Sequence, residues 1–324
     1  MDFNWTLFFQ LLIIGISTGS LIALIALGYT LVYGIIELIN FAHGEVFMMG
    51  AFFAIQVMII SSVTSDSSGA AILAALAMAL MLAMMFSALL NFGIDRIAYK
   101  RLRNAPRLAP LIAAIGVSFI LQNIGIYWKG PNPLRPPTLI PSEYRSFNIL
   151  TEWVGLETRV RFRLLDLMVI AVTIPILIGL VWFVYRTRIG TAMRATAQDR
   201  DAAALMGIDI NRTISVAFLL GGALAGAAGV IAIVYNDSAR FSMGFRYGLF
   251  AFTAAVLGGI GNLTGAVVGG LMIGIVWSFS DGFMKQYIAG WGTQWTTSVI
   301  FGVLVLVLIF RPSGIFGEQT ADKV

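Results

Sequence analysis

The sequence predicts an all-α, polytopic bundle of transmembrane helices, with about eight or nine spans and some broken or re-entrant helices. Of the 324 residues, 59% are hydrophobic and only 11% are charged, whereas soluble domains carry about 25% charged residues. Eight windows contain no Asp, Glu, Lys or Arg. These windows show no strand-like alternation, so helices must satisfy the backbone in lipid. A soluble globular protein is excluded.

The uncharged windows cover 3–36, 46–65, 67–94, 108–128, 167–185, 213–236, 247–280 and 286–310. A helix needs about 20 residues to cross a hydrocarbon core of about 30 Å, so each window suffices, or nearly suffices, for one span. The first and the seventh windows are too long for a single span. We expect the first helix at about 7–30, retained rather than cleaved, because a signal peptide begins with basic residues and this segment has none.

Basic residues cluster in two loops, 95–107 and 186–212, which are separated by two predicted spans and therefore face the same compartment. Together they carry ten Lys and Arg near span ends, which is typical of cytoplasmic loops. We therefore expect the N-terminus outside and the C-terminus in the cytoplasm. The bases form no continuous face, which argues against a nucleic-acid partner. The chain has no cysteine and one histidine, His43, which argues against metal sites and nucleophilic catalysis.

The 129–163 connection is the one sizeable segment on the outer side. Its five prolines give it stiff, non-helical geometry, and about 35 residues are too few to bury a core of their own. We therefore expect a single transmembrane domain, 1–324, with this connection lying on the outer mouth as a plug, a lid or a docking surface. The arginines at 159, 161 and 163 alternate, which suits an extended strand, an interfacial anchor or a solvated cluster facing the headgroups.

Polar residues gather after the first window, in GYTLVYGIIELINFAHGEVFMMGA at 28–51. Ionisable groups at membrane depth are costly, so Glu37, His43 and Glu45 signal a cavity or a break in the helix. If the chain turns at the inner surface, they are loop residues at an interface. If it unwinds inside the bundle, Asn40, His43 and Glu45 line an aqueous path. The sequence leaves both interpretations open.

The 186–212 connection is too helix-prone to be a simple turn, and we expect a short surface helix within it. Its alanines favour helix, Asp199 or Asp201 can cap the helix start, and Gly207 supplies a stop at the end. The helix is expected either to rest on lipid headgroups or to insert into a soluble partner, and the mixture of basic and small residues favours the headgroups.

Glycines four residues apart recur between 219 and 274, at Gly222 and Gly226, Gly265 and Gly269, and Gly270 and Gly274. This spacing predicts close helix packing. GGIGNLTG at 258–265 is different, because four glycines with Asn262 and Thr264 interrupt a window that is too long for one helix. It predicts a broken helix or a tight inner turn.

Four blocks together resemble the membrane permease of ABC importers for branched-chain and other neutral amino acids. They are the 28–51 block, RNAPRLAPLIAAIGVSFILQN at 103–123, GGIGNLTGAVVGG at 258–270 and RPSGIFGE at 311–318. In that light, Asp201, Ala202, Ala203 and Gly207 are similar to the Glu-Ala-Ala-x-x-x-Gly loop by which importer permeases dock their ATPases, with Asp201 in place of the usual Glu.

The resemblance implies an import complex in a bacterial inner membrane. This chain would pair with a second, homologous permease, two cytoplasmic ATP-binding subunits and an external substrate-binding protein, with a rigid coupling helix at about 196–206. The chain has no Gly-x-x-x-x-Gly-Lys-Ser/Thr loop, so ATP would be bound and hydrolysed by the partners. It is thus expected to be a translocation subunit without a cofactor or catalytic residue of its own.

Two other functions remain open from the sequence. Related permeases carry urea and short amides, and an ion-coupled secondary carrier would use Glu37, His43 and Glu45 as a relay. No Lys or Arg lies inside the eight windows, so neutral solutes are preferred over anions. For a zwitterion with an apolar side chain, the expected path combines Asn40, His43, Asn262 and Thr264 near helix breaks with an apolar lining.

Overall fold

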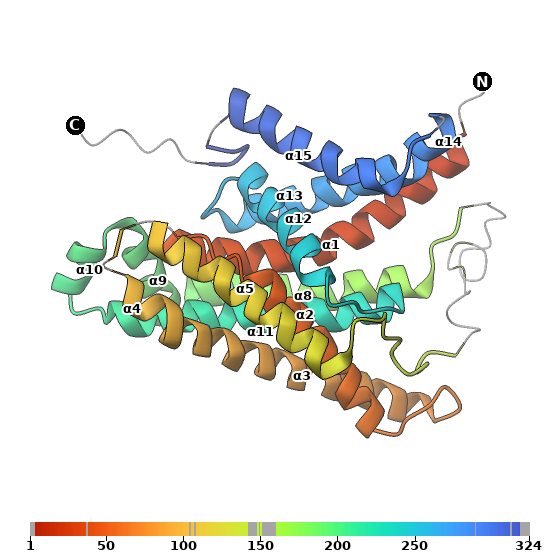
Figure 1. Cartoon of the computed structure of the whole chain (residues 1–324), viewed down its shortest axis with the longest axis horizontal. Helices are drawn as coiled ribbons and strands as arrows, with labels where there is room; N and C mark the ends of the chain where they lie inside the picture. Colours follow the sequence, from red (N-terminus) through yellow and green to blue (C-terminus); the bar gives the residue numbers. More distant parts are fainter. Residues whose placement is uncertain are drawn as a thin grey trace.

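A computed structural model confirms the all-α fold class (Figure 1). It describes residues 4–36, 38–103, 105–106, 108–141, 148, 150, 160–288, 290–311 and 313–317. Over this part of the chain the secondary structure is helical, and the only β pairing is in two isolated bridges, Leu134 with Ala239 and Asn148 with Arg163.

The helices follow one another along the chain as antiparallel rods. They are α1 (Trp5–Ile36), α2 (His43–Ile60), α3 (Gly69–Ile94) with a π-helical turn (Asp95–Tyr99) and α4 (Lys100–Leu102), α5 (Leu108–Lys129), α8 (Leu164–Arg186), α9 (Arg188–Gln198), α10 (Arg200–Leu205), α11 (Ile210–Asn236), α12 (Met243–Gly258), α13 (Leu263–Ser278) with a second π-helical turn (Phe279–Met284), α14 (Lys285–Tyr287) and α15 (Thr293–Phe310). Within the described residues, seven helices are long and apolar enough to cross a membrane, and α12 and α15 are shorter apolar helices.

The first window forms one continuous helix that is one candidate span, so the prediction that it is too long for a single span is wrong. α1 has 32 residues, which is about 48 Å at 1.5 Å per residue, and it extends beyond the predicted 7–30 at both ends. Its glycines lie singly within an apolar sequence that has no proline. Isolated glycines weaken a helix by only about 0.5–1 kcal/mol each, so packing can keep α1 intact.

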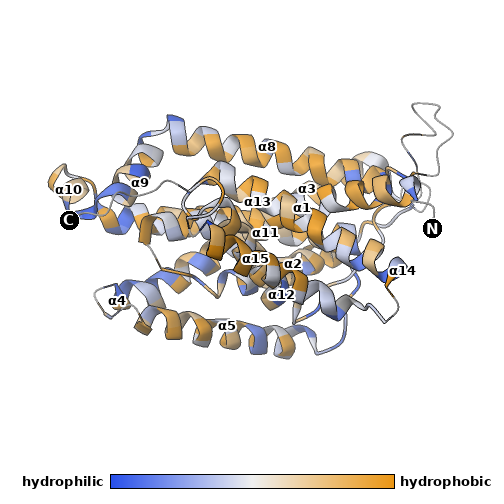
Figure 2. Ribbon diagram, turned by 90° about the horizontal axis from the view of Figure 1, so that it is seen from above, coloured by the Kyte–Doolittle hydropathy of each residue, from blue (hydrophilic) through white to orange (hydrophobic). Residues whose placement is uncertain are grey.

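The helices form a buried centre and a lipid-like exterior. α1, α2 and α11 are mostly buried, whereas most residues of α3, α5 and α8 are partly or fully exposed. The exposed surfaces of α5 and α8 are largely hydrophobic (Figure 2). A bundle that is apolar outside as well as inside fits a membrane rather than water.

The glycines at four-residue spacing lie where helix backbones meet, which confirms close packing. A Cβ atom on Gly274 of α13 would lie 2.3 Å from the Cα of Gly19 of α1. A Cβ on Gly226 of α11 would lie 2.4 Å from the carbonyl oxygen of Ala83 of α3. Any larger residue would force these helices apart.

The predicted break in the seventh window is confirmed. α12 ends at Gly258 and α13 begins at Leu263, and the turn between them contains Gly259 at φ +99° and Gly261 at φ +95°, which are conformations that favour glycine. Asn262 caps α13 by accepting a hydrogen bond from the backbone N–H of Gly265 at 2.9 Å. The C-terminal segment closes over this turn, and Phe316 donates its N–H to the carbonyl of Gly258 at 3.1 Å.

Residues 130–141 of the 129–163 connection are non-helical, as the prolines predict. Residues 160–163 lie at the end of the bundle where α1 begins, because Arg161 donates its backbone N–H to the side chain of Gln10 at 2.6 Å. Arg163 pairs with Asn148 in an isolated bridge, and Arg159 lies outside the described residues. α9 and α10 lie at the opposite end (Figure 1).

Candidate functional site

α2 starts inside the bundle and not at its surface. Glu45, in the first turn of α2, accepts a hydrogen bond from Ser118 at 3.4 Å, and Ser118 is close to the midpoint of the 22-residue α5. This placement corresponds to the second interpretation of the 28–51 segment, in which the chain unwinds inside the bundle. Glu37 lies outside the described residues.

A cavity of about 290 Å³ lies beside Glu45, between α1, α2, α5 and α12. Its polar lining consists of Tyr29, Glu45, Ser118 and Gln122, and its larger apolar side chains are Phe41, Ile115, Phe119, Phe245 and Leu249. The volume is near the lower end of the roughly 300–1,000 Å³ of small-molecule sites. A few polar groups in an apolar wall are the composition expected for a neutral amino acid path.

Two glycines of α12 leave room for the polar groups of this cavity. A Cβ on Gly244 would lie 2.2 Å from Glu45 Oε2, and a Cβ on Gly248 would lie 3.2 Å from the Tyr29 hydroxyl oxygen. The N-terminal ends of α2 and α12 both lie beside the Glu45 carboxylate. The positive ends of two helix dipoles therefore offset part of the cost of burying this carboxylate.

His43 is buried but belongs to a different surface of α2. Its ring packs against Tyr29, with ring centroids 4.8 Å apart, and its Nε2 occupies the space that a side chain on Gly28 would fill. Neither ring nitrogen makes a hydrogen bond of normal geometry within the described residues, although the ring interacts with the Ile25 backbone. His43 is absent from the cavity lining, so the structure does not join it to Glu45 there.

Asn40 holds the link between α1 and α2 in a buried polar network. Its Oδ1 accepts hydrogen bonds from the Tyr99 hydroxyl at 3.0 Å and the Ala42 N–H at 3.1 Å, and its Nδ2 donates to Asn91 at 3.3 Å. Asp95 accepts from Ser215 at 2.8 Å and from Arg103 at 2.5 Å. Asn40 therefore contacts protein groups, not the cavity.

Asn91 and Tyr99, which bond to Asn40, are not among the candidates predicted from sequence, and neither is Asp95, which bonds to Ser215 and Arg103. Asn91, Asp95 and Tyr99 recur every four residues at the end of an apolar window, and this spacing places them on one helix face. That polar stripe is the signal by which they can be found. The network ties α3 to α11, because Asn91 also donates to the Phe218 carbonyl at 2.7 Å.

Asn262 and Thr264 lie apart from the Glu45 cavity. Asn262 caps α13 and donates to the Phe316 carbonyl at 3.0 Å, and Thr264 is exposed. The neighbouring Gly261 and Leu263 line a smaller cavity of about 90 Å³ with residues of α9. The structure therefore places this turn at the α9 end of the bundle, so it does not bring these two residues together with His43 or Glu45.

The 186–212 connection contains two helices joined by a sharp corner. Asp199 caps α10 by accepting from the N–H groups of Asp201 and Ala202 at 2.9 and 3.0 Å. Gly207, at φ +86°, ends it. Of the two aspartates considered from sequence, Asp199 is the cap. A single rigid helix over 196–206 is wrong, because the extended backbone of Asp199 separates α9 from α10.

α10 presents an unusual apolar tip. Leu205 is 90% exposed and Met206 is 84% exposed, beside the exposed Asp201 and Ala202 and the buried Ala203. The helix is tied to the transmembrane core by Arg200, whose guanidinium donates to the Ile35 carbonyl at 2.8 and 3.2 Å. The tip is thus linked directly to the end of α1.

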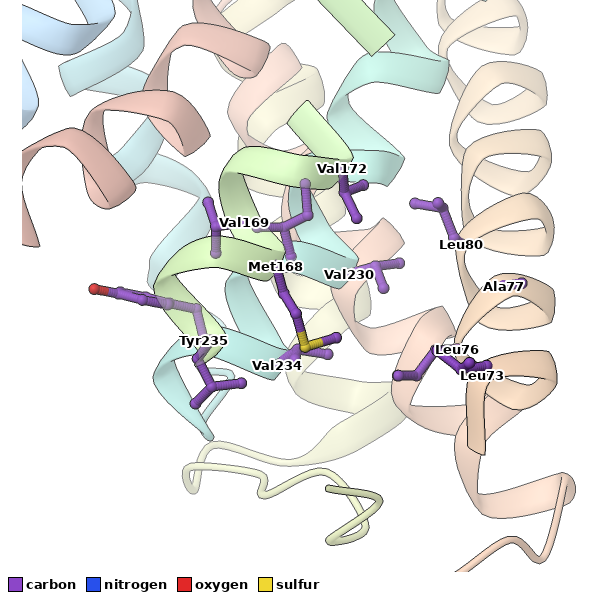
Figure 3. Close-up of a pocket in the computed structure, with 12 residues that line it drawn as sticks. Leu73, Leu76, Ala77, Leu80, Met168, Val169, Val172, Val230, Val234 and Tyr235 are labelled. Carbon is purple, nitrogen blue, oxygen red and sulfur yellow. The ribbon is translucent and has the colours of Figure 1, made fainter. Parts of the chain in front are cut away.

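A second cavity, of about 240 Å³, lies between α3, α8 and α11. Figure 3 shows Met168, Val169 and Val172 of α8 on one side and Leu76 and Leu80 of α3 on the other. Tyr235 and Met168 line this cavity, and its other lining residues are aliphatic. It offers no charged group that could orient a zwitterion.

The family model described as "Branched-chain amino acid transport system / permease component" matches residues 11–309. The high-affinity branched-chain amino acid transport system permease protein BraD of Pseudomonas aeruginosa is 39% identical over 98% of both chains. LivH of Escherichia coli, with the same description, is 35% identical over the whole of both chains. The D-allose transport system permease protein AlsC of Escherichia coli is 27% identical over 70% of this chain and 69% of its own. No solved structure matches significantly.

Proposed function

Because the chain belongs to the family of permease components of branched-chain amino acid transport systems, we propose that it translocates branched-chain or other neutral amino acids in an ATP-driven importer. The observation that carries this proposal is the match to branched-chain amino acid permeases along essentially the whole chain. The partly apolar cavity with few polar groups supports a substrate of this kind. Urea or a short amide is the alternative substrate.

The proposed complex contains a second homologous permease, two cytoplasmic ATP-binding subunits and an external substrate-binding protein. The sequence has no phosphate-binding loop, which supports ATP hydrolysis by other subunits. The proposed location is a bacterial inner membrane, with the N-terminus outside and the C-terminus in the cytoplasm. The basic residues of the α3–α5 and α8–α11 connections support this orientation.

In the proposed mechanism, α10 docks on an ATP-binding subunit through Asp201, Ala202 and the exposed Leu205 and Met206. A buried partner surface explains why two large apolar side chains project at this tip. Closure of the ATPase pair moves α10, and the hydrogen bonds from Arg200 to the Ile35 carbonyl pass this movement to α1. α1 contributes Tyr29 to the cavity, so access can alternate by rigid-body movement.

Reconstitution of the complete importer in vesicles tests the proposed function. We expect ATP-dependent uptake of labelled leucine. Unlabelled neutral amino acids should reduce this uptake by competition, and urea should not. We also expect the ATP-binding subunits to co-purify with the chain. Uptake that follows an ion gradient without ATPase subunits would instead establish a secondary carrier, and uptake of urea alone would overturn the substrate.

Docking through α10 gives a sharper prediction. Gly207→Val places a β-branched residue at φ +86° and should distort the α10 end, so that leucine uptake falls at least several-fold while the permease stays in the membrane. Asp201→Arg should act similarly through charge. Gly130→Val is the matched control, because Gly130 has φ +83° and equally open surroundings at the opposite end of the bundle. Normal uptake and ATPase association in the Gly207 and Asp201 variants would contradict docking at this tip.

A further inference from the structure

The cavity beside α2 contains a carboxylate without a full set of partners. Glu45 is 1% exposed, yet its Oε2 makes no hydrogen bond within the described residues, and its Oε1 has only the long 3.4 Å contact with Ser118. Among the lining residues, none is Lys or Arg. A carboxylate at membrane depth is costly unless it is compensated, and the helix ends of α2 and α12 supply only partial charges. The cavity therefore favours a ligand that carries a positive charge.

We propose that this cavity binds the amino acid in transit and that the Glu45 carboxylate holds the substrate's ammonium group. This proposal rests on the function proposed above and adds the chemical group that the permease recognises. A charge-assisted hydrogen bond between N⁺–H and a carboxylate is about twice as strong as a neutral one. Glu45 thus supplies the main polar anchor for the substrate.

The remainder of the cavity matches the rest of a neutral amino acid. Phe41, Ile115 and Leu249 provide an apolar wall for an aliphatic side chain. The Tyr29 hydroxyl and the Gln122 amide also line the cavity, and both types of group can donate hydrogen bonds to the substrate carboxylate. Phe119 and Phe245 are exposed, so the cavity reaches the surface of this subunit and provides a route of entry.

This arrangement distinguishes amino acids from the alternative substrates. The Glu45 carboxylate repels anions, and urea has no cationic group to place beside it. An ion relay through Glu45 and His43 needs the two side chains on one path, but His43 lies outside the cavity, against Gly28 and Tyr29. Binding of an ammonium group is the role that fits both the position and the open hydrogen-bonding capacity of Glu45.

Transport coupling in vesicles that contain the complete importer tests the role of Glu45. The wild-type complex is measured first, because its failure to import leucine with ATP would refute the proposed function and not this site. Glu45→Gln keeps the side-chain shape and removes the charge, and we expect leucine imported per ATP hydrolysed to fall about tenfold, with the complex still assembled. Wild-type coupling, or loss of the second permease from the complex, would overturn the proposal.

Asp166→Asn is the matched control for removing a buried carboxylate. Asp166 is fully buried but lies outside the cavity, where it accepts a hydrogen bond from Tyr235 at 2.8 Å and pairs with Arg163. We expect this variant to lose heat stability and to keep the leucine imported per ATP. A fall in coupling equal to that of Glu45→Gln would show a general effect of buried charge and would overturn the specific role of Glu45.

Cysteine labelling provides a test that does not need transport. The chain has no cysteine, so Phe245→Cys places one reporter at the exposed mouth of the cavity. Thr64→Cys places one in the exposed polar connection between α2 and α3. With cysteine-free partners, a cationic aminoethyl methanethiosulfonate should label position 245 about tenfold faster than its anionic sulfonatoethyl counterpart. Leucine should protect this position.

The same two reagents should label position 64 at similar rates, with or without leucine. Adding Glu45→Gln should abolish the preference for the cationic reagent at position 245. Equal rates for the two reagents at position 245 when Glu45 is present, or no protection by leucine, would overturn the proposal.

Discussion

The first and seventh uncharged windows have the same length and the same apolar character, yet one forms a continuous helix and the other is broken. In the window 3–36, single glycines sit within long apolar runs, and α1 is unbroken. In the window 247–280, Gly258, Gly259 and Gly261 come within four positions, and the chain turns there. The comparison teaches that clustering of glycines, and not window length, decides whether a membrane helix ends.

The two windows also pack against each other, and the glycines of each lie at this contact. The glycines of α1 at 15 and 19 meet the backbone of α13 near Gly270 and Gly274. The same residue type therefore has two physical roles. In α1 and α13 it allows close approach between backbones, whereas in the 258–262 turn it allows a positive φ.

Replacing Gly274 should have the largest effect on the contact between α1 and α13. In Gly274→Leu, a Cβ atom would lie 2.3 Å from the Gly19 backbone, so α1 and α13 must separate. We expect a loss of about 4 kcal/mol or more, seen as a low yield of monodisperse protein and a lower unfolding temperature. Gly179→Leu in α8 is the control, because nothing lies within 4 Å of its Cβ position. Equal effects would show that the Gly274 contact is unimportant.

Two substitutions in the 258–262 turn should lower the stability by different amounts. Gly261→Ala at φ +95° has open surroundings and should cost about 1–2 kcal/mol from backbone strain alone. Gly259→Ala at φ +99° should cost more, because its Cβ would also lie 2.5 Å from the Gly317 nitrogen and displace the C-terminal segment. Thermal unfolding of both variants in detergent gives the order, and the reverse order would contradict the role of that segment.

The smallest effect is expected at the helix cap. Asn262→Ala removes the hydrogen bond to the Gly265 N–H and the one to the Phe316 carbonyl, which should cost about 1 kcal/mol. Asn262→Asp keeps the cap acceptor but loses the donor, so it should recover part of that stability. Because Asn262 lies outside the Glu45 cavity, leucine uptake measured at low temperature should change less than twofold.

The sequence was sufficient to predict features that depend on neighbouring residues. The all-α class, the turn at 258–262, the close packing of glycines and the short helix that ends at Gly207 follow from composition and local spacing. Contacts over long separations were not predictable in this way. Nothing in the sequence pairs Asn40 with Asn91 and Tyr99, or brings Gly244 and Ser118 to Glu45, because these contacts depend on how the helices pack.

For the same reason, the fold brings together only part of the substrate path expected from sequence. Glu45 lines the cavity. Asn262 and Thr264 are expected on the same path because they lie near a helix break, but that break is at the end of the bundle. Asn40 and His43 closely precede Glu45 in sequence, yet rotation about the α2 axis and the preceding turn direct them to other partners. Proximity in sequence at a break therefore does not imply a shared surface.

The C-terminal segment over the 258–262 turn has a consequence for biosynthesis. The carbonyls of Leu257 and Gly258 accept hydrogen bonds from the N–H groups of Ile315 and Phe316, which the ribosome makes much later. At about 5–20 residues per second, these partners follow only after a few seconds. During this interval the end of α12 must find water or a temporary partner, so the turn between α12 and α13 is completed only after Phe316 has been made.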